Sequence, residues 1–269
     1  MRASWILFLL TVLKSWSFSG VQAQPFESGA RARALGGVRV VGSFQAGNPA
    51  AWVTVQKWAV AFGYVRPFGL AALQGSGMLG VGRTPWGVGS IALRQAGFEQ
   101  YKEVQIGVGW SYRFQMPFQT QLAVGIQGYR QHIRISRYGS KGWWGVLLGW
   151  ELYIAEHLVV GGQLLNPHRA QHPFRRPLPQ EIQVGIAYQP VKTVWILGAL
   201  RKELGYALEP QAGIEVQWVP WMAIRAGMQA LDRFAIGFGF FVKGIRVDFS
   251  LASHPWLGWT PAFSIAIQR

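Results

Sequence analysis

Apolar and polar residues alternate with a period of two along most of this chain. The clearest segment spans residues 103–115, with Val104, Ile106, Val108, Trp110, Tyr112 and Phe114 on one face and Gln, Gly, Ser and Arg on the other. Successive side chains of a β-strand point to opposite sides, so the pattern predicts a strand with one apolar and one polar face. It recurs at 181–189, 211–218, 234–252 and 262–268. About fourteen such segments follow one another from residue 57 to the C-terminus.

The connections between these segments alternate between short and long. Tight connections are expected at 84–86, 155–157, 189–192, 219–221 and 243–244, and longer ones at 136–142, 166–180, 202–210 and 253–258. A membrane barrel has short turns on one rim and longer loops on the other. Closure of the sheet leaves no strand edge unsatisfied in lipid. We therefore expect an all-β protein, a transmembrane antiparallel up-and-down β-barrel of about fourteen strands over residues 57–269.

A soluble β-sandwich or propeller is the alternative fold. A propeller would repeat in four-strand blades, and a sandwich would turn its apolar faces against each other, so neither uses this many outward Trp and Phe residues. The composition also favours the membrane, since 50% of the chain is apolar and only 14% is charged. The Trp residues are scattered, as expected for rings at two membrane interfaces. The chain has no cysteine, so its stability must come from sheet closure and packing.

The N-terminal residues 1–23 have the features of a secretory signal peptide. Arg2 is followed by an apolar run over 5–13, and Val21-Gln22-Ala23 forms a small-x-small cleavage site. The alternative is a membrane anchor, although the apolar run is shorter than the roughly 18 residues that a spanning helix needs. The mature chain is expected to begin at Gln24 and to lie outside the cytoplasm.

Residues 24–56 do not alternate like the rest, and the part over 28–52 is rich in Gly and Ala. That part carries three Arg residues and no acidic residue, which suits a polar interior better than a lipid-facing surface. Its Asn-Pro step predicts a turn or a helix start. We expect a plug inside the barrel, the alternative being a disordered leader. The candidate plug residues are Arg31, Arg33, Gly36, Gly37, Arg39, Asn48 and Pro49.

Charged residues also occupy the polar faces of the predicted strands. These candidate lumen residues are Arg94, Arg113, Glu151, Glu215, Arg225, Arg246 and Asp248. Two interpretations are open: charge ladders that fill and rigidify the interior, or a constriction that selects solutes. The surplus of Arg would favour anionic solutes in an open pore. Pairing of the plug arginines with these carboxylates would keep the pore shut.

No catalytic residues and no metal site are expected. His132 and Ser136 share one face of a strand, but at roughly 3.3 Å per residue they lie about 13 Å apart, too far for a hydrogen bond. With only two aspartates, a protease built on Asp and His is not supported either. The loop over 166–180 contains His168 and His172 but no carboxylate until residue 181, so it suggests a surface that meets anionic lipopolysaccharide and not a metal site. No cofactor is expected.

The charge balance bears on the partners of the protein. The formal net charge is +15, which fits anionic lipid or anionic solutes. Lys and Arg are spread over the segments without a dense run or a recognisable motif, so nucleic acid is the weakest candidate and is not expected as a partner.

Three stretches together resemble a known family: Ser28-Gly-Ala-Arg-Ala-Arg-Ala-Leu-Gly-Gly37, Asn48-Pro49-Ala50, and His254-Pro-Trp-Leu-Gly-Trp-Thr260 before the final strand. With about fourteen strands, they make the chain similar to outer-membrane barrels of the PorV and PorQ type, whose fold is similar to that of the FadL fatty acid channels. The resemblance implies a plug in the barrel mouth and a location in the bacterial outer membrane.

This resemblance also implies a function. It indicates a non-enzymatic accessory of protein secretion or surface attachment, with outer-membrane lipid, lipopolysaccharide and secretion-system proteins as partners. The alternative is a FadL-like channel for the uptake of hydrophobic solutes. An uptake channel needs an apolar pocket beside the plug, whereas an accessory protein needs a loop surface that binds other proteins.

Overall fold

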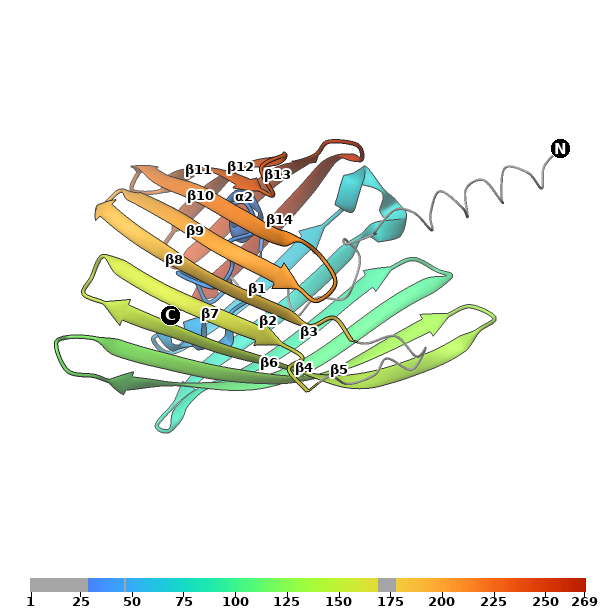
Figure 1. Cartoon of the computed structure of the whole chain (residues 1–269), viewed down its shortest axis with the longest axis horizontal. Helices are drawn as coiled ribbons and strands as arrows, with labels where there is room; N and C mark the ends of the chain where they lie inside the picture. The colour runs from blue at the N-terminus through green and yellow to red at the C-terminus, as the bar shows by residue number, and fades with distance from the viewer. Residues whose placement is uncertain (1–28, 46, 169–177) are drawn as a thin grey trace.

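The computed structural model describes residues 29–45, 47–168 and 178–269. Its strands form one closed sheet in which each strand pairs with its neighbours in the chain and β1 pairs with β14 (Figure 1). The expected antiparallel up-and-down barrel is confirmed, and it has fourteen strands. No helix in the described ranges is both long and apolar enough to span a membrane. The predicted signal peptide over 1–23 and the first plug residues, 24–28, lie outside the described residues.

The strands follow one another from residue 58 to residue 268. They are β1 (Trp58–Val65), β2 (Gly75–Thr84), β3 (Gly87–Gly97), β4 (Tyr101–Gln115), β5 (Gln121–Ile135), β6 (Gly139–Ile154), β7 (Leu158–Leu165), β8 (Glu181–Val191), β9 (Val194–Glu203), β10 (Leu208–Val219), β11 (Met222–Gln229), β12 (Arg233–Val242), β13 (Ile245–His254) and β14 (Gly258–Gln268).

The two rims of the barrel differ in their connections. At the terminal rim, where β1 begins and β14 ends, the turns span two to five residues. The opposite loop rim carries the two short 3-10 helices η2 (Pro67–Gly69) and η3 (Ala71–Leu73) and the connection from β7 to β8. The loops expected at 136–142, 202–210 and 253–258 are shorter than predicted, because the strands continue into them. For example, β5 ends at Ile135 and β6 starts at Gly139.

Three neighbouring strands are longer than the others. β4 and β5 have 15 residues each and β6 has 16, whereas the remaining strands have at most 12. β6 pairs with β7 only from Leu147 onward, so its first residues pair with β5 alone. The β5–β6 hairpin therefore projects past its neighbours (Figure 1).

The outer face of the barrel is apolar between two groups of aromatic rings. Val108, Ile126 and Ile182 are exposed on it. Trp86, Trp110, Trp218 and Trp221 lie toward the terminal rim, and Trp144, Trp256 and Trp259 toward the loop rim. This distribution matches the one expected for rings at two membrane interfaces.

The segment before β1 lies inside the barrel (Figure 1). It contains the helix α2 (Ala30–Ala34), which contacts β11 to β14, and the 3-10 helix η1 (Pro49–Thr54), which contacts β3 to β6. Leu35, Val38 and Val40 of this segment are buried against the inner face of β7 to β9. The apolar core thus lies between the plug and the wall.

Glycines on the inner face of the wall make room for the plug. A Cβ added at Gly125 would lie 2.4 Å from the carbonyl carbon of Pro49, and one at Gly227 would lie 2.1 Å from the nitrogen of Gly36. Distances this short leave no space for a side chain. The same close approach occurs along the path of the plug at Gly109, Gly149, Gly161, Gly213 and Gly237.

Candidate functional site: the plug inside the barrel

One group of buried charges joins α2 to the strands on one side of the lumen. Arg31 donates two hydrogen bonds to Glu215, from Nε at 2.8 Å and from Nη2 at 3.1 Å. Glu215 also pairs with Arg225 of the next strand. Asp248 lies 2.8 Å from Arg225 Nη1 and accepts a 2.8 Å bond from Arg246 Nε. We call these five residues the β10–β13 cluster.

Strand alternation places the wall residues of this cluster on the inward face, and register brings them together. Glu215 is the register partner of Arg225 on β11, and both point into the lumen. The cluster holds three guanidinium groups against two carboxylates. Burial by itself lowers the pKa of Arg31, but the nearby Glu215 carboxylate raises it above its ordinary value, so Arg31 stays charged. The plug is thus tied to the wall by an ion pair between Arg31 and Glu215.

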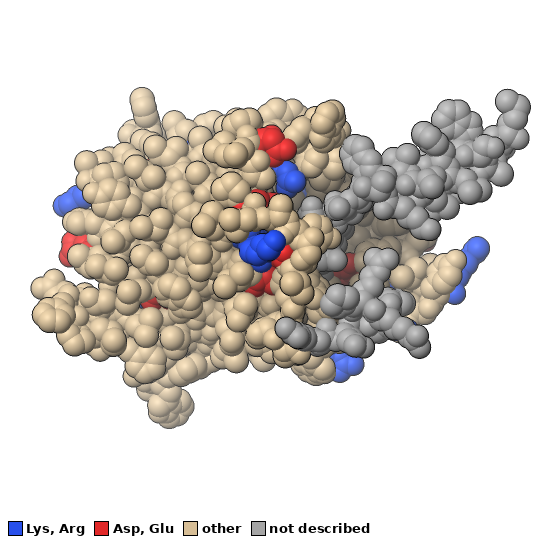
Figure 2. Space-filling model, viewed as in Figure 1, with Lys and Arg blue, Asp and Glu red and all other residues tan. Residues whose placement is uncertain are grey.

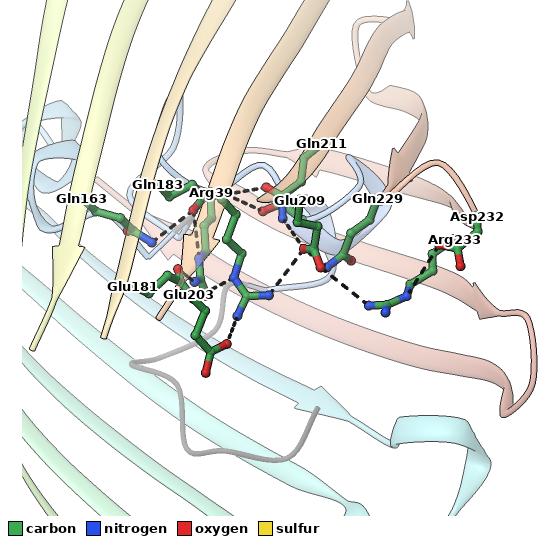
Figure 3. A network of polar contacts seen from close by, with 12 residues as sticks. Arg39, Gln163, Glu181, Gln183, Glu203, Glu209, Gln211, Gln229, Asp232 and Arg233 are labelled. Carbon is green, nitrogen blue, oxygen red and sulfur yellow. Dashed lines mark hydrogen bonds and ion pairs between the residues drawn. The ribbon is translucent and has the colours of Figure 1, made fainter. Parts of the chain in front are cut away.

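A second group of charges holds the middle of the plug (Figure 3). Arg39 pairs with Glu181 of β8 and donates a 3.1 Å bond to Gln183. Arg201 lies 2.7 Å from Glu181 and also pairs with Glu203 and Glu209. We call Arg39, Glu181, Arg201, Glu203 and Glu209 the β8–β10 cluster.

Amide side chains extend this second cluster around the inner wall (Figure 3). Gln163 donates to Gln183 at 3.2 Å, Gln183 donates to Gln211, and Gln229 donates to Glu209 at 2.6 Å. These residues were not among the predicted site residues, and neither were Glu181, Arg201, Glu203 and Glu209. Their signal in the sequence is that they share the inward alternation of the predicted Glu215.

Asn48 fastens the second half of the plug. Its side-chain nitrogen donates to the carbonyl of Val40 at 2.8 Å and to that of Trp150, in the wall, at 3.2 Å. Its side-chain oxygen accepts the 3.0 Å bond from the Ala50 nitrogen that caps η1, and Pro49 follows in the first position of that helix. The predicted Asn-Pro step is therefore a helix start.

Gly36 and Gly37 end α2. Both have positive φ, 67° and 82°, a backbone conformation that favours glycine. A Cβ at Gly36 would also lie 2.3 Å from the carbonyl oxygen of Met228. These two glycines let the chain turn while it touches the wall.

The other predicted lumen charges lie away from these clusters. Arg113 donates to the Val53 carbonyl at 3.2 Å and lies over the Tyr153 ring, whose hydroxyl donates to the fully buried Glu151. Arg83, which was not predicted, donates to Val53 and Val55 carbonyls at 2.7 and 3.0 Å. The predicted charges therefore do not converge on one constriction.

Arg33 of α2 and Arg94 of β3 lie toward the loop rim. Both line a cavity of about 30 Å³ next to Gly29 and Ala30. Gly63 and Gly77 line the same cavity from β1 and β2.

A larger cavity, of about 550 Å³, opens beside the plug at the terminal rim. The plug turn supplies Gly42, Ser43 and Phe44, and η1 supplies Thr54. The wall supplies apolar, polar and charged side chains, namely Phe241, Val242, Lys243, Ile245, Arg246, Ala266 and Gln268. This pocket lies beside the plug, but its lining mixes apolar side chains with polar and charged ones.

Several solved structures have a similar fold. No protein-family model and no curated protein matches the sequence. Among solved structures, the monoaromatic hydrocarbon channel CymD has a TM-score of 0.62 at 11% identity, covering 91% of this chain and 98% of that one. The toluene transporter TbuX of Ralstonia pickettii has a TM-score of 0.60 at 11% identity, with 91% and 99% coverage. The toluene transporter TodX of Pseudomonas putida has a TM-score of 0.60 at 10% identity, with 91% and 98% coverage.

An outer membrane protein of Acinetobacter baumannii is also similar, with a TM-score of 0.53 at 7% identity and coverage of 81% and 100%. Identities this low show the fold alone. The FadL-like fold implied by the sequence is thus supported, and the expected outer-membrane location agrees with these neighbours. They do not support the finer resemblance to PorV and PorQ.

Proposed function

We propose that this protein is a plugged, non-enzymatic outer-membrane channel that admits small hydrophobic solutes. Outer-membrane barrels have their short turns in the periplasm, so the terminal rim of this protein faces the periplasm and the loop rim faces the cell exterior. The observation that carries the proposal is the cavity of about 550 Å³ between the plug and β12 to β14. The similar structures named as channels or transporters of toluene and other monoaromatic hydrocarbons support it.

The solute path in this proposal runs through the interior, not through the wall. Every strand pairs with both of its neighbours around the closed sheet, including β2 with β1 and β3, and the register shifts lie at the ends of β8 and β10. The plug occupies the space that a solute must cross, so passage requires the plug to shift. The cavity borders the plug turn at Gly42 to Phe44 and is the space into which a solute would leave.

Narrowing this cavity tests the proposal. Thr54→Trp places a large ring at the cavity, whereas Thr84→Trp makes the same change on the terminal rim outside its lining. Each hydroxyl donates one local hydrogen bond, to Ala51 at 2.7 Å and to Gly87 at 3.0 Å, so the two changes are matched. Uptake of labelled toluene would be measured in intact Gram-negative cells that lack hydrocarbon channels of their own.

We expect the unmodified protein to raise toluene uptake above that of cells without it. Thr54→Trp should reduce that gain several-fold, and Thr84→Trp should preserve it. Equal uptake with and without the protein would rule out the channel, and equal gains from both variants would rule out this cavity as part of the path.

An accessory role of the PorV and PorQ type is the second candidate. It rests on the sequence resemblance and on a lumen filled by the plug and two charge clusters. This role predicts no gain in solute uptake. It also predicts that secretion-system proteins co-purify specifically with the protein, and that they no longer do so when the projecting β5–β6 hairpin is shortened.

A further inference from the structure

Four basic side chains gather on the outer face of the barrel at the loop rim. Lys102 of β4 and Arg130, His132 and Arg134 of β5 are all exposed and share the outward alternation of their strands. We call them the outer basic cluster. Arg130, His132 and Arg134 lie on the strand that leads into the projecting β5–β6 hairpin, and Figure 2 shows basic side chains at the end of that hairpin.

Two members of the cluster lie directly opposite each other on β4 and β5. Lys102 and Arg134 are register partners, and side chains directly opposite each other on antiparallel strands have Cβ atoms about 5 Å apart. Like charges in that position destabilise the pair. A bound anion would remove this repulsion.

The outer face of the described strands offers no carboxylate to neutralise the cluster. Every acidic residue within a described strand has the inward alternation: Glu103, Glu151, Glu181, Glu203, Glu209, Glu215 and Asp248. Glu99, in the β3–β4 turn, borders the cluster. Glu99 and Lys102 line the same groove. The cluster therefore retains net positive charge.

The position of the cluster matches the boundary between the acyl chains and the head groups of a membrane. Below it on the same outward face are Ile106, Val108 and Ile126, which are exposed and apolar. The Arg130 guanidinium lies over the ring of Trp144, 5.4 Å from its centroid. Trp prefers the interface between apolar and polar layers of a membrane.

A polar groove adjoins the cluster on its β3 side. Its volume is about 410 Å³, and its lining includes Tyr64, Ser76, Gln95, Glu99 and Lys102. Hydroxyl and amide groups such as these donate and accept hydrogen bonds in the way that sugar hydroxyls require.

We propose that the outer basic cluster binds the phosphorylated sugar head group of the outer-leaflet glycolipid, lipopolysaccharide. Lys102, Arg130 and Arg134 contact a phosphate, since guanidinium and ammonium groups both bind phosphate oxygens strongly. The acyl chains lie along Ile106 and Ile126, and the sugar lies in the polar groove. This site is independent of solute transport and holds equally for a channel or an accessory protein.

Binding to defined lipids tests the site. The full mature protein, refolded in detergent without lipopolysaccharide, would be titrated with lipid A, dephosphorylated lipid A, phosphatidylglycerol and inorganic phosphate, with bound ligand counted by native mass spectrometry. The test variant is K102Q/R134Q. The matched control is K192Q/K243Q, which removes two positive charges from turns of the opposite rim.

We expect K102Q/R134Q to bind lipid A at least tenfold more weakly than the unmodified protein, and K192Q/K243Q to bind it equally well. K102R/R134K, which keeps both charges, should restore binding. Heat-modifiable gel mobility checks that each variant is folded, and if K102Q/R134Q fails to fold, R130Q takes its place.

Dephosphorylated lipid A should bind at least tenfold more weakly than lipid A. Unchanged lipid A affinity in the folded test variant would overturn the site. Equal affinity for phosphatidylglycerol would overturn the glycolipid assignment, and saturation by inorganic phosphate at equal affinity would show a free-anion site instead.

Discussion

At the residue scale, the inner wall combines two kinds of position. Where the plug backbone comes closest to the wall the wall residue is glycine, as at Gly125 and Gly227, because any side chain there would overlap the plug backbone. Where the plug carries a charge the wall carries its partner, as for Arg31 with Glu215. The polar faces seen in the sequence are thus the surface that receives the plug.

Gly149→Ala should loosen the plug. The added Cβ would lie 1.9 Å from the side-chain oxygen of Asn48, so Asn48 must move and give up its bonds to Val40 and Trp150. We expect the free energy of unfolding to fall by about 1–3 kcal/mol, as for other overpacked sites. Urea unfolding in lipid vesicles, followed by Trp fluorescence, would measure it. Gly128→Ala, where no atom lies within 4 Å of the new Cβ, is the control and should change little.

Glu215→Gln should be more damaging, because it removes the charge that Arg31 and Arg225 share. Loss of one partner from a buried ion pair costs about 3–5 kcal/mol. The same urea experiment applies, with Glu156→Gln in an exposed turn as the control. A loss below about 1 kcal/mol, the usual value of an exposed pair, would mean that the cluster does not stabilise the plugged state.

At the element scale, the plug is one segment fastened at three places. Arg31 ties α2 to β10, Arg39 ties the middle to β8, and Asn48 ties the start of η1 to β6. The β10–β13 cluster has one more cation than anions, and the β8–β10 cluster has one more anion than cations. A plug held by several separate attachments can be released in part without unfolding the wall.

The two plug arginines offer a test of this arrangement. R31Q/R39Q removes both ionic attachments and should convert a silent protein into one with fluctuating conductance in a planar bilayer. R130Q/R134Q makes the same change on the outer face and should stay silent. If both double variants show no conductance, Arg31 and Arg39 do not keep the channel shut.

At the scale of the whole molecule, the barrel closes through backbone hydrogen bonds between β1 and β14 and does not depend on the plug for any strand pair. Its outer face is apolar and its charged strand residues lie mostly inside, the reverse of a soluble sheet protein. Stability of the wall and closure of the pore are therefore separate properties.

Deletion of residues 24–51 should leave the wall intact and open the lumen. We expect an unchanged β-sheet circular dichroism spectrum, retained heat-modifiable gel mobility, and steady conductance. Arg31 is removed with the plug, so Arg225 and Arg246 are balanced by Glu215 and Asp248, and the open lumen should show no strong anion preference. Loss of heat-modifiable mobility would show that the plug is needed for barrel assembly.

Much of this architecture could be predicted because a strand has a period of two. Alternation alone places Glu215, Arg225 and Asp248 on inward faces, whatever the exact register. It also places Lys102 and Arg134 outward, but their meeting across β4 and β5 depends on pairing. Loop lengths were overestimated at 136–142, since Gly and Ser in a long hairpin are compatible with a strand that continues.

The sequence by itself determined the class of fold and the two faces of its wall, since both follow from local alternation and turn residues. Only the tertiary structure decided which charges meet. Arg31 and Glu215 are 184 residues apart and Arg39 and Glu181 are 142 apart, and no local pattern relates them. Their pairing results from the path of the plug, which is set by where the closed barrel leaves space between glycines. That path depends on the register of all fourteen strands at once.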